Sequence, residues 1–104
     1  MQALTTATAT LADTGVLEVT LDCNVTFYVT TTIGTGDIAM KMSLDNSTWV
    51  AYSPGVGATA VVITADDAIN TYWLPAGAYF KFTNTGNTAA TTVYVSGHHI
   101  NVNV

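Results

Sequence analysis

The chain has 104 residues, enough for one domain, and 49% of them are hydrophobic while only 9% are charged. Two lysines, no arginine and seven acidic residues give a net charge of −5 at pH 7, which argues against binding to nucleic acids and to anionic membranes. The single cysteine excludes an intrachain disulfide, and no apolar run approaches the roughly 18 residues of a membrane-spanning helix.

The first eleven residues carry no charge and are rich in threonine. Residues 4–11 are predicted to form a strand. The whole segment 1–11 is alternatively predicted to extend as an arm, because an uncharged extended segment can add a strand to the open sheet edge of a neighbouring protein. Leu4 is therefore a candidate residue for contact with a partner.

Apolar and polar residues then alternate with a period of two, which is typical of strands with one buried face. Turn sequences rich in Gly, Pro, Asp and Asn, such as residues 12–15 and 34–36, separate these runs. In the first half of the chain the predicted strands are residues 16–21, 25–30, 37–44 and 48–52. Their core-facing side chains are expected to be Leu17, Val19, Leu21, Val25, Phe27, Val29, Ile38, Met40, Met42, Leu44 and Trp49.

The segment Ser43–Trp49 resembles the Asp-box of sialidases, but it is one residue shorter and lacks the glycine at the bend. We interpret it as a hairpin in which Asp45, Asn46 and Ser47 turn the chain, since these residue types favour turns.

In the second half of the chain the predicted strands are residues 60–64, 69–74, 78–83, 91–96 and 98–104, and residues 65–69 are a candidate for a single helical turn. Neighbouring residues on a strand point to opposite faces, so the pairs Tyr72–Trp73 and Tyr79–Phe80 each place one ring outside the core. Exposed Tyr and Trp mark either a protein interface or a platform on which sugars stack.

Tyr72 and Tyr79 are predicted to face outward and to contact another subunit, and Trp73 is a further contact candidate. Trp73 and Tyr72, with Asn70, are also a candidate sugar-stacking platform. The terminal strand is predicted to be a sheet edge that needs cover, which makes Ile100 and Val102 contact candidates.

Few residues support catalysis or metal binding. Asp66 and Asp67 could supply half of a glycosidase pair or act as cation ligands, but capping of a turn is the favoured interpretation. His98 and His99 would point to opposite faces of a strand, and Cys23 is interpreted as a small filler. The chain shows no Ser-His-Asp spacing, phosphate-binding loop or metal-ligand cluster. We therefore expect no enzymatic activity, no cofactor and no metal.

Together these patterns predict an all-β protein: a single antiparallel β-sandwich or jelly-roll-like domain over residues 1–104, with eight or nine short strands. The scarcity of charge is unusual, because soluble domains carry about 25% charged residues. A surface poor in charge costs little to desolvate. It therefore favours a protein that works while packed against other protein.

Three segments resemble a known family. They are the hairpin Met42–Val50 with the turn Pro54–Gly57, the turn and strand Leu74–Phe82, and the closing strand Thr91–His99. These segments, about half of the chain, are similar to elements of small β-sandwich capsid decoration (cement) proteins of tailed bacteriophages.

The resemblance implies a virion structural protein, assembled in the host cytoplasm, that binds the outside of the phage head. It further implies a homo-oligomer, with a homotrimer favoured, that clamps neighbouring subunits of the major capsid protein. Two other functions stay open. The chain could be a structural protein of a tail, neck or fibre, or it could be a carbohydrate-binding module.

Overall fold

The computed structural model describes residues 2–5, 12–30, 36–55, 57–64, 68–86 and 92–104. Within these ranges the chain forms strands and no helix, and therefore no helix that could cross a membrane. The strands are β1 (Gln2–Thr5), β2 (Ala12–Asp13), β3 (Leu17–Val19), β4 (Cys23–Thr30), β5 (Asp37–Ser43), β6 (Val50–Ala51), β7 (Val62–Ile63), β8 (Ala68–Leu74), β9 (Tyr79–Thr85), β10 (Thr92–Ser96) and β11 (Ile100–Val102). Eight of these eleven strands have three or more residues, and β2, β6 and β7 have two each.

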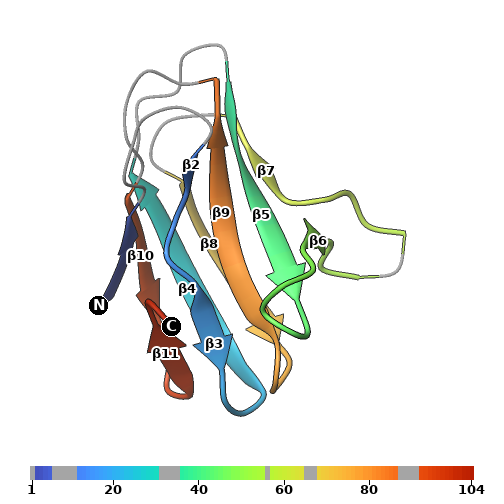
Figure 1. Ribbon diagram of the computed structural model, residues 1–104, viewed down its shortest axis with the longest axis vertical. Helices are drawn as coiled ribbons and strands as arrows, with labels where there is room; N and C mark the ends of the chain where they lie inside the picture. The colour runs from blue at the N-terminus through green and yellow to red at the C-terminus, as the bar shows by residue number, and fades with distance from the viewer. Residues whose placement is uncertain (1, 6–11, 31–35, 56, 65–67, 87–91) are drawn as a thin grey trace.

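The strands form two antiparallel sheets that pack against each other (Figure 1). One sheet has four strands in the order β1-β10-β4-β8. The other has seven, in the order β11-β3-β9-β5-β6, with β2 beside β9 and β7 beside β5. The predicted all-β sandwich is confirmed.

The strand pairs are nested along the chain. β5 pairs with β6 and β7, β4 pairs with β8, β2 and β3 pair with β9, and β1 pairs with β10. Successive pairs lie alternately in the two sheets, as they do when one long hairpin is rolled up on itself. This arrangement is the strand order of a jelly roll.

Alternating residues of both sheets fill the core between them. In β4, for example, Val25, Phe27 and Val29 are buried while the residues between them are not. Phe27 meets Phe82 of the opposite sheet edge-on, with 5.3 Å between ring centroids. Burial of each such side chain contributes about 1.5–3 kcal/mol, so this layer dominates the stability of the domain.

The alternation fails just beyond strand ends. Leu21 and Leu44 were expected in the core but are 56% and 74% exposed. Their strands end at Val19 and Ser43, so the period-two rule no longer applies to the residues that follow. The core prediction for these two leucines is therefore wrong.

Trp49 was also expected inside, and it lies outside. Its ring is 4.4 Å from Nζ of Lys81. Lys81 points outward because Phe80 and Phe82, its neighbours in β9, are buried. Trp49 precedes the short strand β6 and covers the outer side of the seven-stranded sheet instead of its core.

Three other segments differ from the sequence prediction. Ala12 and Asp13, expected in a turn, form β2 beside β9. Ala68, part of the candidate helical turn, begins β8 together with the predicted strand 69–74, and residues 65–67, which include Asp66 and Asp67, lie outside the described residues. His98 and His99 are exposed in a bend before β11 rather than in the terminal strand, so they are not held on opposite faces.

Candidate protein interaction surface

The charged residues of the described strands all belong to the seven-stranded sheet. Strands β1, β4, β8 and β10, which make up the other sheet, contain none. The charged residues are Asp13 in β2, Glu18 in β3, Asp37 and Lys41 in β5, and Lys81 in β9. In β3, β5 and β9 they alternate with buried residues, so they point to the outer face of that sheet.

Much of the charge on this outer face is already paired. The Asp13 carboxylate accepts hydrogen bonds from Nζ of Lys81 at 2.6 Å and from Oγ1 of Thr83 at 2.9 Å. Partial burial raises the pKa of Asp13, but these two hydrogen bonds and the positive charges of Lys81 and Lys41 together outweigh it, and the net pKa lies below the ordinary 3.8. Glu18 accepts a bond of 3.0 Å from Nδ2 of Asn101.

The outer face of the four-stranded sheet has no charged side chain among the described residues, and we call it the uncharged face. It consists of Asn24, Thr26, Tyr28 and Thr30 of β4, Ile69, Thr71 and Trp73 of β8, and Thr92, Tyr94 and Ser96 of β10.

Strand register sets the rows of the uncharged face. Tyr28 lies between Ile69 and Tyr94, and the rings of Tyr28 and Tyr94 meet edge-on with 6.2 Å between centroids. Thr26 lies beside Thr71, and their hydroxyls are hydrogen-bonded at 2.8 Å.

Three large side chains of this face remain open to solvent. Ile69 is 63% exposed, Trp73 58% and Tyr94 37%. With the Thr26 and Thr71 hydroxyls bonded to each other and no charge to desolvate, such a face is suited to contact with protein.

Of the sequence-predicted contact residues, Trp73 lies on the uncharged face and its neighbour Tyr72 does not. Tyr72 aligns with Val25 and packs into the sandwich, with its ring 6.3 Å from that of Phe27 and 5.9 Å from that of Tyr52. Burial raises the pKa of Tyr72 above 10.0. The prediction that Tyr72 faces outward is wrong, because the β4 register assigns the outward position to Trp73.

The same alternation separates the candidate sugar-stacking platform. Asn70 aligns with the buried Phe27, so it lies on the side of Tyr72, whereas Trp73 lies on the opposite side of β8. The three residues therefore do not share one face.

The other predicted contact residues lie elsewhere. Tyr79 points outward from the seven-stranded sheet, between Glu18 and Ser43, and is half-buried. Ile100 and Val102 of the edge strand β11 turn inward and pack against the core.

The predicted N-terminal arm is partly overturned. Leu4 pairs with Val93, so Gln2–Thr5 belongs to the protein's own sheet, and residues 6–11 lie outside the described residues.

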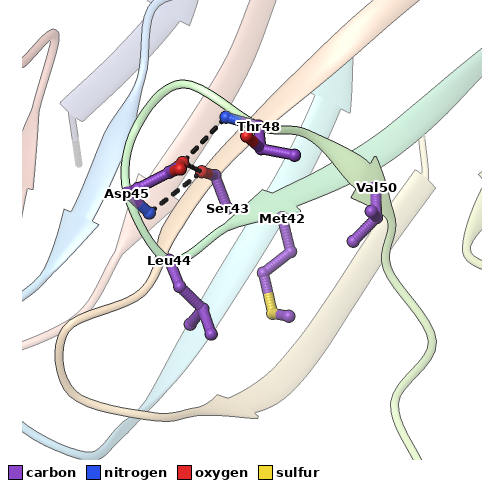
Figure 2. Close-up of a pocket in the computed structure, with 6 residues that line it drawn as sticks. All are labelled: Met42, Ser43, Leu44, Asp45, Thr48 and Val50. Carbon is purple, nitrogen blue, oxygen red and sulfur yellow. Dashed lines mark hydrogen bonds between the residues drawn. The ribbon is translucent and has the colours of Figure 1, made fainter.

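Two pockets open at the side of the sandwich where β5, β6 and β8 end. The larger, about 400 Å³, is lined by Met42, Tyr52, Ser53, Pro54, Gly55, Trp73 and Pro75. The smaller, about 260 Å³, is lined by Met42, Ser43, Leu44, Asp45, Thr48 and Val50. Figure 2 shows the Met42, Leu44 and Val50 side chains pointing the same way, while Asp45 turns back toward Ser43 and Thr48.

Asp45 and Tyr52 are the ionisable residues that line these two pockets. Burial raises the pKa of Tyr52 above 10.0, and Oδ1 of Asp45 is engaged by the turn. Oδ1 accepts hydrogen bonds from the backbone N–H groups of Thr48 at 2.7 Å and Ser47 at 2.9 Å, and from Oγ of Ser43 at 2.8 Å. These bonds, that of Thr48 foremost, hold the pKa of Asp45 well below 3.8. The pockets therefore present apolar surface rather than a poised acid or base.

The part of the chain that the structure describes brings together no group of three or more His, Cys, Asp or Glu side chains. Cys23 is partly buried and packs against the core.

Comparison with known proteins gives no relative: no family model, curated protein or solved structure matches this chain.

Sequence analysis did not assign Tyr28, Ile69 and Tyr94 to a surface. The signal was present, because residues 23–30, 68–74 and 92–96 contain no charge. The sequence does not show that these three segments are neighbours in one sheet, and the strand order β10-β4-β8 brings them together.

Proposed function

We propose that this protein is a structural binding module that docks onto other protein through its uncharged face and carries out no chemical step. The observation that supports this role is the segregation of strand charge onto the opposite sheet. Docking through the uncharged face desolvates threonine hydroxyls and aromatic rings but no charge, and it leaves the charged strand residues of the seven-stranded sheet in solvent.

Within this role, our specific proposal is a capsid decoration protein of a tailed bacteriophage that binds the major capsid protein on the outside of the head. The resemblance of Met42–Val50 and Leu74–Phe82 to such proteins supports it, and so does the small jelly-roll fold. A module seated across a joint between capsid subunits adds buried area there. If the module binds only the expanded form of the capsid and not the form that precedes expansion, it stabilises the expanded form by mass action.

The size of the uncharged face makes several contacts necessary. Four strands spaced ~4.8 Å apart, with about five residues each at ~3.3 Å, cover roughly 300–400 Å². A stable interface needs about 800 Å² from each partner. Linked copies that engage several capsid subunits together would overcome this shortfall through effective concentration.

Copy number tests the decoration role. In virions of the phage that encodes this chain, quantitative mass spectrometry should find it in numbers of the same order as the major capsid protein. A few copies per particle would assign it to the tail, neck or fibre instead, and absence from particles would overturn a virion role.

A pair of variants tests the uncharged face. Tyr94→Asp places a charge in this face, and we expect binding to shells stripped of the protein to fall by at least tenfold. Val62→Asp adds the same charge on the outer side of the seven-stranded sheet, where Val62 is 47% exposed, and should bind like the wild type. Equal binding by both variants would show that another surface docks.

A further inference from the structure

β8 differs from the other sheet edges. It is the last strand of the four-stranded sheet, and within the described residues it pairs with β4 alone. It has seven residues, whereas the opposite edge strand β1 has four, β11 has three, and β6 and β7 have two each. A long edge strand offers a row of backbone N–H and C=O groups to another chain.

The sequence of β8 lacks the features that normally protect an edge. Ala68–Leu74 contains no Lys, no other charge, no Pro and no Gly, and Pro75 follows only after the strand ends. At the other edge, the C-terminal segment approaches β1, where Nδ2 of Asn103 donates a bond of 3.2 Å to the Ala3 carbonyl. Within the described residues, β8 is thus the longest edge strand with a side on which no strand pairs.

We propose that β8 pairs antiparallel with β8 of a second copy of this chain. The two-fold axis that relates the copies lies midway between their two Thr71 residues. Two copies of a strand related by a two-fold axis can pair antiparallel only when one residue lies opposite itself in the other copy, because directly opposed side chains must lie on the same face of the sheet. Thr71 is the middle residue of β8, so this register pairs all seven residues.

This register also matches the exposed apolar side chains. Ile69 and Trp73 lie two residues before and two after Thr71, so Ile69 of each copy faces Trp73 of the other on the uncharged face. These two side chains are 63% and 58% exposed in the single chain. Directly opposed side chains lie about 4.5–5.5 Å apart between Cβ atoms, and apolar–aromatic pairs at that distance stabilise a sheet.

Charge favours a second copy at this edge over an approach elsewhere. Each chain carries −5, so contacts between randomly chosen surfaces bring carboxylates together. Pairing at the β8 edge brings no carboxylates of the described strands together. The product is a continuous eight-stranded sheet whose uncharged face is twice as large, which supplies the area that one copy lacks for docking. The inference thus extends the proposed function, but it concerns the free protein.

Light scattering of the purified protein is the first test. We expect twice the monomer mass of 10.9 kDa at micromolar concentration. Thr71→Lys places two ammonium groups opposite each other at the axis and should give a monomer. Ser96→Lys adds the same charge to the exposed β10 side of the same face and should remain a dimer. A wild-type monomer or trimer would overturn the two-fold pairing.

Disulfide trapping reports the register and does not depend on a destabilising variant. In a Cys23→Ala background, Thr71→Cys should form a cross-linked dimer on mild oxidation, because residue 71 of one chain lies opposite residue 71 of the other. Thr26→Cys, on the neighbouring strand, is the control, since two such residues would lie roughly 14 Å apart, three strand spacings. Failure of Thr71→Cys to cross-link, or equal cross-linking at Thr26, would refute the register.

The two proposals fail separately. A monomer that still binds shells in high copy number would remove the β8 pairing and keep the decoration role. A Thr71-dependent dimer that is absent from virions would keep the β8 pairing and remove the decoration role.

Discussion

Asp45 shows how one exposed carboxylate organises a turn. Its Oδ1 accepts bonds from Ser43, Ser47 and Thr48, and Asn46 beside it adopts a positive φ of 57°, which asparagine tolerates better than most residues. The sequence predicted this hairpin because Asp, Asn and Ser stabilise turns through their own side chains. It did not predict that the turn would leave Leu44 exposed beside a pocket.

The depressed pKa of Asp45 makes this turn sensitive to acid. A carboxylate whose pKa is lower in the folded state stabilises the fold above its ordinary pKa of 3.8, and this contribution is lost as pH falls through the folded value. We expect Asp45→Ala to have a lower melting temperature than the wild type at pH 7. In strong acid the difference in melting temperature between the two proteins should be smaller. Thermal unfolding followed by circular dichroism at several pH values measures this. Ser47→Ala is the control, because Ser47 donates through its backbone N–H, and a similar loss for it would contradict this account.

At the scale of strands, alternation predicted which face of each segment is buried and failed where strands stop. Within β4 the inward residues Val25, Phe27 and Val29 are as expected. Tyr72 was misplaced because its neighbour Trp73 is equally aromatic, and only the register with β4 decides which of the two turns inward. Pairing partners follow from the nested topology, which a period of two does not encode.

The start of β5 depends on a glycine. A Cβ atom built on Gly36 would lie 1.9 Å from the Thr85 carbonyl oxygen, next to the pair formed by Asp37 and Thr85. We therefore expect Gly36→Ala to destabilise the domain by about 1–3 kcal/mol, since backbone must shift to relieve the contact. Gly55→Ala is the matched control, because no atom lies within 4 Å of its added Cβ. Denaturant unfolding measures both, and equal stability of the two variants would contradict the packing argument.

At the scale of the whole molecule, the separation of charge between the two sheets decides how association responds to salt. Contacts through the uncharged face and the β8 edge bring together no charged groups of the described strands, so they are not subject to Debye screening. Sulfate, which favours burial of surface, should strengthen them.

We accordingly expect dimer mass and shell binding to change by less than about twofold between 0.1 and 1 M sodium chloride. Light scattering and a shell co-sedimentation assay measure the two quantities. Loss of association by an order of magnitude over this range would show that the charged outer face of the seven-stranded sheet makes the contact.

The bond between Asn103 and the Ala3 carbonyl has a practical consequence for anyone who extends this chain. It places the two termini together on the β1 side, at the edge of the four-stranded sheet opposite β8 (Figure 1). A fluorophore or peptide cargo fused at either end would leave from that side, about three strand spacings from β8. Paired copies would then carry their cargo at the two outer rims of one continuous platform.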